Sequence, residues 1–331
     1  MQTGQMPSND WRNEYLVFSE LSSMGGDSEL RAMVRAGVVH RVALGVYRFA
    51  AAGKFSAQWQ HDDDDYLARI RGASLATSRP LVFSHHSAAA LLALPSARAN
   101  ASSRRVHVVG YRAGGGRSTT GLVRHTVGVP DELEVRGSLT CTALARTVAD
   151  VASVAPIPQA VAVADAALAG MQDQWGMLER LQLEPERLQD EIAGRKSSRG
   201  IRQLRWVAEF ANGLSGSPGE SISRWAMHAI GCPPPVLQQP FADSVGPIGI
   251  VDFWWPEFNV IGEFDGQSKY VREEYTAGAD AADIVIAEKL REDRLRATAT
   301  GPRVVRWGWD ATQNLSLLAR KLRNAGLPCN W

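Results

Sequence analysis

Two apolar segments near the C-terminus constrain the fold of this chain more than any other feature. Residues 248–255 and 260–265 are rich in β-branched and aromatic residues, and residues 256–259 form a turn-like break between them. The register that a symmetric turn imposes puts Trp255 opposite Val260. One face of the pair is then apolar, with Val251, Phe253, Trp255, Val260 and Phe264. The pattern predicts an antiparallel hairpin with one face in a core.

The other face of the hairpin gathers carboxylates. The same register puts Asp252 opposite Glu263, and alternation along the strand places Asp265 on their face. Directly opposed like charges destabilise a sheet by roughly 0.2–1 kcal/mol per pair. A hard divalent cation, Mg²⁺ or Mn²⁺, would compensate them and could generate a hydroxide that attacks a phosphodiester. The alternative is a solvated face without an ion. The three acids are therefore candidate metal ligands and catalytic residues.

Two further residues are catalytic candidates at the same site. Lys269, four residues beyond Asp265, is placed to contact the attacked phosphate or to orient a water. Glu220 opens a helix after a Ser-Pro-Gly sequence, where an outer carboxylate of the metal site and a capping box are equally good interpretations. A charged helix is expected at about 283–297, mostly as a salt-bridged face, and Arg291 on it is a candidate phosphate contact.

The N-terminal segment predicts a DNA-binding module. Residues 14–49 read as a helix, a tight turn, a second helix and a β-hairpin, which is the plan of a winged helix-turn-helix. Arg31 and Arg35 lie one turn apart on the second helix, and Arg41 and Arg48 lie on the hairpin. Such a helix reads bases in the major groove while flanking cations contact phosphates. The four arginines are candidate DNA contacts; the alternative is a winged helix that binds protein.

Strands and helices alternate between residues 81 and 170. Ser84 is expected to cap a helix that begins with His85-His86. Adjacent helical residues point about 100° apart, so this pair predicts a buried, hydrogen-bonded histidine rather than a shared metal. Arg146 and Asp150, four residues apart on a later helix, are expected to form an ion pair.

Composition sets outer limits. A length of 331 residues predicts two or three domains. The sequence contains no run of 18 apolar residues, so a membrane span is not expected. The N-terminal sequence lacks the basic and apolar regions of a secretory signal. Three widely separated cysteines predict neither a disulfide framework nor a zinc site, which fits a reducing cytoplasm. A net charge of +1 argues against a polycation that coats nucleic acid, although a local basic patch is compatible with it.

The N-terminal half resembles a known family. The sequence LRAMVRAGVVHRVALGVYRF, the segment from Phe83 to Ala89 and the helix from Thr142 to Asp150 resemble the AbiEi-type antitoxins. The resemblance covers about residues 14–170. It implies a DNA-binding repressor or antitoxin, with a nucleotidyltransferase-like toxin as a candidate partner.

The C-terminal region is similar to the PD-(D/E)XK nuclease superfamily, and more closely to small endonuclease-like domains related to very-short-patch repair enzymes. The motifs are Ser217–Glu220, Val251–Phe253, Glu263–Gly266, Arg291–Leu295 and Val304–Trp307. The resemblance implies metal-dependent DNA cleavage. Asp265 stands where the superfamily has its lysine, so Lys269 or Gln267 is the expected substitute. The histidine of the repair enzymes has no counterpart after His228.

These observations predict an α/β chain, α+β overall, in four segments. A winged helix-turn-helix is expected at 1–55, an AbiEi-like α/β domain at 56–183, a linker at 184–200 and a restriction-endonuclease-like mixed sheet flanked by helices at 201–331. One expected function is that of a Mg²⁺-dependent endonuclease on double-stranded DNA. The other is that of an antitoxin or transcriptional repressor with a catalytically inactive nuclease-like scaffold. Both expectations place the protein in the cytoplasm, without a membrane partner, and leave its oligomeric state open.

Overall fold

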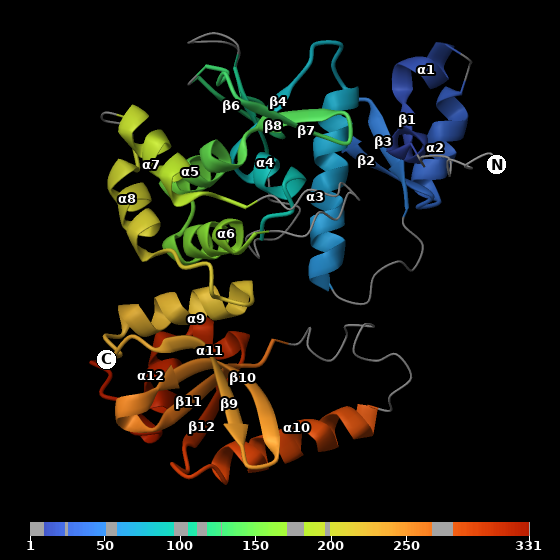
Figure 1. Ribbon diagram of the computed structural model, residues 1–331. Coiled ribbons are helices and arrows are strands. Elements are labelled where there is room, and N and C mark those ends of the chain that lie inside the picture. Colours follow the sequence, from blue (N-terminus) through green and yellow to red (C-terminus); the bar gives the residue numbers. More distant parts are fainter. Residues whose placement is uncertain are drawn as a thin grey trace, which may run out of the picture. The chain divides into compact units, whose positions relative to one another are not determined.

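The computed structural model describes residues 10–23, 26–50, 58–95, 105–110, 118–126, 128–170, 182–195, 199–266 and 281–330. The chain forms two compact units, Met1–Thr147 and Val148–Trp331 (Figure 1). Helices are combined with one antiparallel and two mixed sheets, which confirms the expected α+β class. None of the described helices combines the length and apolar character that a membrane crossing requires.

In the first unit two helices and a hairpin lie where residues 14–49 predict them, and a short strand occupies Tyr15–Val17, which were expected to open the first helix. The elements are β1 (Tyr15–Val17), α1 (Phe18–Ser23), α2 (Asp27–Arg35), β2 (Val39–Ala43) and β3 (Val46–Phe49), followed by α3 (Gln58–Leu75). Strand β1 adds to the hairpin, so that the sheet has the order β1-β3-β2. Tyr15, Val46 and Ala68 of α3 form its small core. The acidic run at 62–65 lies inside α3 rather than at its start.

A five-stranded mixed sheet follows in the same unit. Its elements are β4 (Val82–Phe83), α4 (His85–Leu91), β5 (Val106–Val109), β6 (Leu122–His125), β7 (Leu133–Arg136) and β8 (Leu139–Thr142), in the strand order β6-β5-β4-β8-β7. The hydroxyl of Ser87 on α4 accepts a hydrogen bond from the backbone N–H of His107 on β5 and contacts the Tyr66 hydroxyl. These buried contacts fix α4 against the sheet and against α3.

Helix α5 (Leu144–Val154) spans the boundary between the units, and further helices open the second one. They are α6 (Ile157–Ala169), α7 (Pro185–Gly194), α8 (Ile201–Phe210) and α9 (Pro218–Ala229). Helix α7 lies within the segment expected as a linker, and it buries Leu188 and Ile192. Arg195 at its end donates to Asp150 of α5 over 2.7 Å. The polar composition of this segment suggested a linker. Leu188 and Ile192, one turn apart, are nevertheless enough to give α7 a buried apolar side.

A buried ion pair joins α6 to α9. Asp165 is fully buried, and its two carboxylate oxygens each accept from Nη2 of Arg224 at 2.9 Å. The same carboxylate accepts from the backbone N–H of Asn212 and from the hydroxyl of Ser215. The guanidinium of Arg224 also lies over the ring of Phe210. Every oxygen of the buried acid is thus satisfied, which a charge in a protein interior requires.

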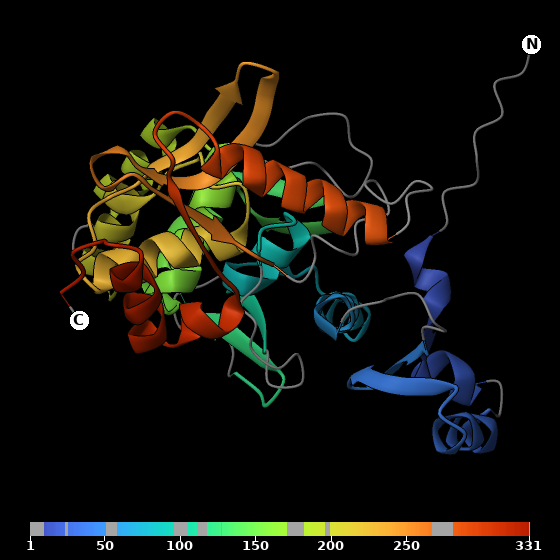
Figure 2. The same cartoon turned by 90° about the horizontal axis from the view of Figure 1, so that it is seen from below.

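The second unit ends in a four-stranded mixed sheet. Its elements are β9 (Val236–Asp243), β10 (Gly246–Trp255), β11 (Val260–Phe264), α10 (Ala281–Arg296), β12 (Arg303–Trp307), α11 (Trp309–Gln313) and α12 (Leu315–Asn324). The strand order is β12-β11-β10-β9, with β11 and β12 parallel and the other neighbours antiparallel. Helix α10 connects the two parallel strands, as a parallel pair requires a crossover. Figure 2 shows α10 running alongside this sheet.

Both faces of the sheet are covered. Phe253, Trp255 and Trp307 pack with α9, α11 and α12 on one face. Ile261 packs against Leu295 of α10 on the other. All residues of β11 are buried, so the solvated face that was the alternative to a metal site is not found on this strand. A strand in the middle of a sheet, followed by a crossover helix, is buried from both sides.

A disulfide joins Cys232 and Cys329 in this unit, with their Cα atoms 4.3 Å apart. Both side chains lie at the edge of the core formed with α9 and α12. The expectation that the cysteines form no disulfide was therefore wrong. The separation of 97 positions along the chain gave no sign that the two cysteines are close together in the fold. Cys141 is a buried free thiol.

Candidate functional site

The hairpin that carries the carboxylates has the expected register. Trp255 is paired with Val260, Trp254 with Ile261, and the ladder ends at Phe253 and Gly262. Asp252 therefore lies one step beyond the last pair. Its Oδ2 accepts a hydrogen bond of 2.8 Å from the backbone N–H of Phe264. The carboxylate replaces a strand carbonyl where β10 and β11 part, and satisfies a backbone donor that would otherwise be orphaned.

Glu263 lies at the centre of the site and is 1% exposed. Its carboxylate is paired with two guanidinium groups, Arg306 Nη2 at 2.7 Å and Arg291 Nη2 at 2.5 Å. Arg306 comes from β12, where it is directly opposite Glu263 in the parallel register. Arg291 comes from α10. Burial raises the pKa of Glu263 to about 7, against the opposing effect of both arginines.

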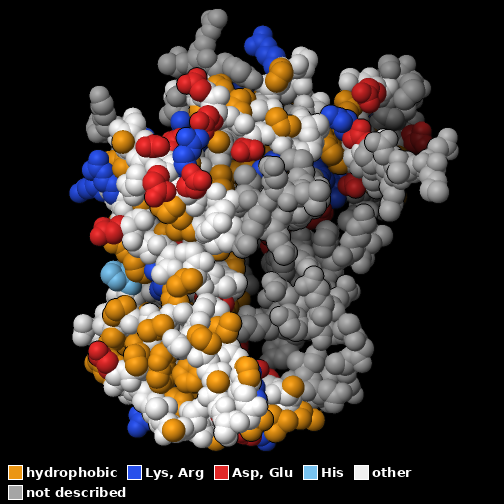
Figure 3. Space-filling model, viewed as in Figure 1, with side chains coloured by type: hydrophobic (Ala, Val, Ile, Leu, Met, Phe, Trp, Pro, Cys, Tyr) orange, Lys and Arg blue, Asp and Glu red, His pale blue; other side chains and the backbone are white. Residues whose placement is uncertain are grey.

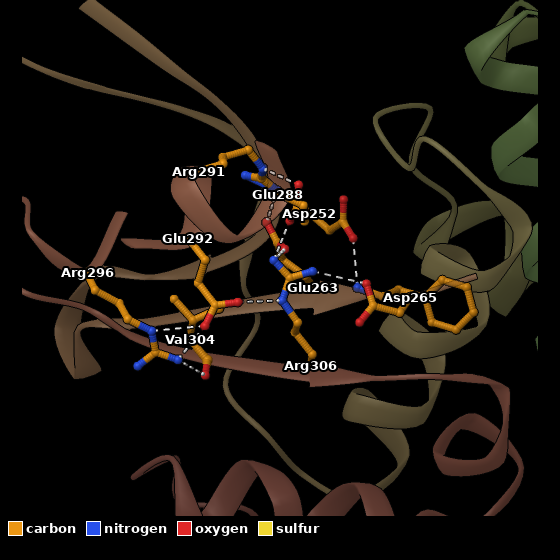
Figure 4. Close-up of polar contacts among 10 residues, drawn as sticks. Asp252, Glu263, Asp265, Glu288, Arg291, Glu292, Arg296, Val304 and Arg306 are labelled. Carbon is orange, nitrogen blue, oxygen red and sulfur yellow. Dashed lines mark hydrogen bonds and ion pairs between the residues drawn. The ribbon is translucent and has the colours of Figure 1, made fainter. Parts of the chain in front are cut away.

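Arg306 connects the remaining acids (Figure 4). It reaches Asp265 at 3.2 Å, Glu288 at 2.5 Å and Glu292 at 3.0 Å, in addition to Glu263. Burial disfavours the charge of Arg306, but the surrounding carboxylates outweigh it and raise its pKa. Burial likewise acts to raise the pKa of Glu288, and the hydrogen bond from Arg306 and the charge of Arg291 reverse this effect and lower it. The site is a compact ionic network.

The arginines provide the charge compensation for which the sequence suggested a cation. Among the described residues, the three-ligand group whose donor atoms lie within 4.8 Å of one another consists of histidines, not of Asp252, Glu263 and Asp265. The structure thus brings the three acids to one end of the hairpin without gathering their oxygens as a metal-ligand set. Arg306 and Glu288 were missed as members of the site, because a parallel pairing across a helical crossover leaves no short-range signal.

Glu220 forms the capping box of α9. Its Oε1 accepts from the Ser217 hydroxyl at 2.8 Å, and its backbone N–H donates to that hydroxyl at 3.3 Å. Its Oε2 accepts from the N–H of Gly216 and from Nε2 of Gln238, both at 2.8 Å. Glu220 is 5% exposed, and its carboxylate is engaged by these donors. Of the two interpretations, the structure shows the cap.

Gly219, beside it, sets how closely α9 approaches the sheet. A Cβ built at this position would lie 2.0 Å from Cε1 of Phe264 on β11. Only a glycine allows the first turn of α9 to rest on this ring. The Ser-Pro-Gly-Glu sequence therefore has a structural explanation at three of its positions: cap, close contact and capping carboxylate.

The other candidates of this site are Lys269, Gln267 and Arg291. Lys269 and Gln267, the two residues considered in place of the lysine that the resemblance implies, lie outside the described residues. Arg291, expected as a phosphate contact, is engaged by Glu263 and by Glu288, the latter at 3.1 Å. Its side chain is 24% exposed. The geometry gives it a structural role in the ionic network.

The arginines of the winged helix divide into two groups. Arg31 and Arg35 of α2 and Arg41 of β2 are exposed. Nε of Arg31 donates to the carbonyl of Asp27 at the start of α2, and Nε of Arg41 donates to Ala43. The contacts of Arg31 and Arg41 are to neighbouring backbone, and all three side chains, that of Arg35 included, lie on the protein surface, where a duplex can reach them.

Arg48 is different, and its expected role as a DNA contact was wrong. It is 5% exposed and pairs with Asp64 of α3 at 2.5 Å and with Glu14 at 3.2 Å. Burial disfavours its charge, but the two carboxylates outweigh this effect and raise its pKa. The side chain points into the contact between the small sheet and α3. The acidic run at 62–65 could have suggested a partner for Arg48, because Asp64, which forms the shorter of the two ion pairs, belongs to it.

Comparison with known proteins identifies relatives of this chain, but none with a described activity. No family model matches the chain. Two uncharacterized proteins, from two strains of Mycobacterium tuberculosis, are each 33% identical to it over 149 residues. The match covers 45% of this chain and 51% of each relative, so the chain spans about half the length of the curated relatives it matches.

Proposed function

We propose that this protein is a DNA-binding regulator of the repressor or antitoxin type, in which the nuclease-like unit is a scaffold. The observation that carries this choice is the position of Arg306, which lies among four of the carboxylates and is held by all of them. A cation that used the same oxygens would have to displace this guanidinium. The arrangement favours an acid set that stabilises the fold over one that binds Mg²⁺.

The winged helix supports the DNA-binding part of the proposal. Helix α2 carries Arg31 and Arg35 on its exposed surface, and Arg41 lies on the adjoining hairpin. A helix with two exposed arginines one turn apart suits the major groove, and a third arginine on the wing suits a phosphate. Such a regulator would act on double-stranded DNA in the cytoplasm.

A protein partner is part of the same proposal. The likeness to AbiEi-type antitoxins suggests a nucleotidyltransferase-like toxin, and a gene for such a protein beside this one would support it. Exposed apolar side chains are available for a protein contact: Val236, Val245 and Ile250 of the β9–β10 hairpin are 44%, 84% and 57% exposed. Figure 3 shows apolar side chains gathered on this part of the surface.

The test of DNA binding is a footprint on the DNA directly upstream of the protein's own gene. We expect protection by the wild type, loss of protection in Arg31→Ala/Arg35→Ala, and retention in Asp252→Ala. Arg202→Ala/Arg205→Ala is the matched control, because it removes two exposed arginines one turn apart from α8. Equal loss in the control variant, or no specific protection by the wild type, would contradict the proposal.

A second candidate is the Mg²⁺- or Mn²⁺-dependent endonuclease, with Asp252, Glu263 and Asp265 as ligands. It is favoured by the excess of carboxylates over guanidinium groups at the site. There are five acids, Asp252, Glu263, Asp265, Glu288 and Glu292, and three arginines that pair within the network, Arg291, Arg296 and Arg306. The assay is nicking of supercoiled plasmid with either ion. Cleavage by the wild type that Asp252→Ala abolishes would establish the enzyme and overturn the scaffold.

A further inference from the structure

Three histidines from separate elements of the first unit meet beside the five-stranded sheet. His85 is the first residue of α4, directly after β4, while His107 lies on β5 and His125 ends β6. Strands β5 and β6 are parallel neighbours, and His107 and His125 are offset by two positions in their register. Side chains two positions apart share a face, so both imidazoles lie on the same side of the sheet. Helix α4 brings His85 to that side.

The ring nitrogens are close together. Nδ1 of His107 lies 3.0 Å from Nε2 of His125, and a nitrogen of His85 completes a set whose members all lie within 4.8 Å of one another. The His85 ring is stacked on that of His125, with centroids 3.6 Å apart. His85 is 5% exposed, and the other two histidines are half-buried. The cluster therefore combines one enclosed ring with two partly exposed ones.

These distances fit a metal centre. Tetrahedral Zn²⁺ with bonds of about 2.0–2.1 Å to imidazole nitrogen separates its ligand atoms by about 3.3 Å. The His107–His125 pair is already near this separation, and metal binding would require the His85 ring to turn out of its parallel stack on His125. We propose that His85, His107 and His125 form a binding site for a divalent transition-metal ion of the Zn²⁺ type.

The chemistry of the donor set defines the class of ion. Neutral imidazole suits Zn²⁺, Cu²⁺, Ni²⁺ and Fe²⁺, whereas Mg²⁺ and Ca²⁺ prefer oxygen. Three protein ligands leave a fourth position for water or a small ligand, which distinguishes this set from a closed structural site with four side chains. The site is therefore separate in place and in metal preference from the carboxylates near β11.

The surroundings hold the ligands in place. Nδ1 of His85 lies 3.1 Å from the hydroxyl of Ser84, which is fully buried, so its Nε2 is directed away from that contact. The backbone N–H of His107 is fixed by Ser87 of α4, at 2.8 Å. A hydrogen bond to the second ring nitrogen, as between Ser84 and His85, fixes the orientation of a ligating ring, and its loss typically weakens a metal site about 10–100-fold.

The test uses the full-length, chelator-treated protein and Co²⁺ as a spectroscopic probe, followed by competition with Zn²⁺. We expect saturable binding of one Co²⁺ per chain, with the visible absorption of a four- or five-coordinate ion, and displacement by Zn²⁺ but not by Mg²⁺. His107→Gln and His125→Gln should each weaken binding at least about tenfold. His40→Gln removes an exposed histidine from β2 of the same unit and should leave the affinity unchanged.

Variants that fail to fold do not decide the matter, so the wild type carries a second measurement. Proton NMR of the Co²⁺-loaded protein should show hyperfine-shifted ring signals from three histidines. The proposal is overturned if the wild type binds no stoichiometric Co²⁺, if folded His107→Gln binds as tightly as the wild type, or if fewer than three histidines are shifted. DNA binding by the winged helix is assayed independently, and neither result determines the other.

Discussion

Arg306 and Glu263 occupy directly opposed positions on the parallel strands β12 and β11, and their side chains form an ion pair of 2.7 Å. Removal of Arg306 leaves a buried carboxylate with one guanidinium instead of two. We expect Arg306→Ala to lower the free energy of unfolding of the second unit by about 3–5 kcal/mol. Urea titration followed by tryptophan fluorescence measures the loss.

The loss in Arg306→Ala should become smaller as the pH falls from about 8 to about 6. Burial raises the pKa of Glu263 to about 7, so acidification neutralises the carboxylate that lost its partner. Arg296→Ala is the control, because Arg296 pairs with Glu292 at the surface and its side chain is 49% exposed. That variant should lose less than about 1 kcal/mol. If both variants lost the same free energy of unfolding, the buried position of the Arg306–Glu263 pair would not be what makes it stabilising.

The capping carboxylate gives a second prediction. Glu220→Ala leaves the N–H of Gly216 and the amide of Gln238 without their acceptor. We expect a loss of about 1–3 kcal/mol in the stability of the second unit. Glu220→Gln keeps one acceptor oxygen and should lose less. Isothermal titration with Mn²⁺ should give the same result for the wild type and Glu220→Gln; a specific loss of Mn²⁺ binding would assign Glu220 to a metal site instead.

Arg48 supplies the corresponding prediction for the first unit. Arg48→Ala leaves Asp64 and Glu14 without the cation that pairs with them. We expect a loss of about 3 kcal/mol, as for other buried pairs broken on one side. Arg41→Ala, on the same hairpin but exposed, should change stability by less than about 0.5 kcal/mol. Thermal unfolding of the two variants separates the structural arginine from the surface one.

The histidine cluster predicts a dependence on pH. Burial lowers the pKa of His107 to about 3, helped by the neighbouring His85, His86 and His125 and by Arg105. Because the unfolded side chain titrates near 6.5, the folded state of the metal-free protein is stable above that pH and loses stability as the pH falls from there towards 3. At a pH of about 5 the loss is roughly 2 kcal/mol.

Hydrogen exchange of the β5 and β6 amides, measured in the presence of a chelator, reports this loss locally. His107→Gln should flatten the pH dependence between about 5 and 7, and His40→Gln should keep it. Protection that is independent of pH in the wild type would contradict the assignment of a neutral buried imidazole.

The disulfide predicts a difference between oxidised and reduced protein. Closing a loop of 97 residues restricts the unfolded chain, and the chain-entropy model assigns about 4–5 kcal/mol to such a loop. Because measured values fall below the model, we expect reduction to lower stability by about 3 kcal/mol. Dithiothreitol should have no further effect on Cys232→Ala/Cys329→Ala. An unchanged unfolding midpoint on reduction of the wild type would contradict the prediction.

Sequence reasoning was strongest where interactions are local. Alternation of apolar residues and the length of the turn predicted the pairing of Trp255 with Val260, and the spacing of Ser217 and Glu220 identified a capping box. Both follow from geometry within a few residues. Arg306 was missed because it enters the site through a parallel strand that follows a helix, so that its contact with Glu263 bridges 43 positions.

The same limit explains the errors in the first unit. Arg48 was assigned to the surface from its place on a hairpin, since the strand pattern does not show that α3 covers it. His107 and His125 were not connected to His85, because the positions of one helix start and two strands along the chain do not show that the three side chains meet. A charged residue on a predicted strand is therefore not necessarily exposed. A helix distant in the sequence can cover it and supply its ion-pair partner, as α3 does for Arg48.

The ion pair between Asp165 and Arg224 limits which part of the chain could be transferred to another protein by gene fusion or recombination. A fragment that begins at residue 201 contains every strand of the β9–β12 sheet, yet it carries Arg224 without the buried acid that receives it. Gene fusion or recombination at that point would leave an unpaired cation against Phe210. A segment that keeps this pair has to include α6, which begins at Ile157, 44 residues before residue 201.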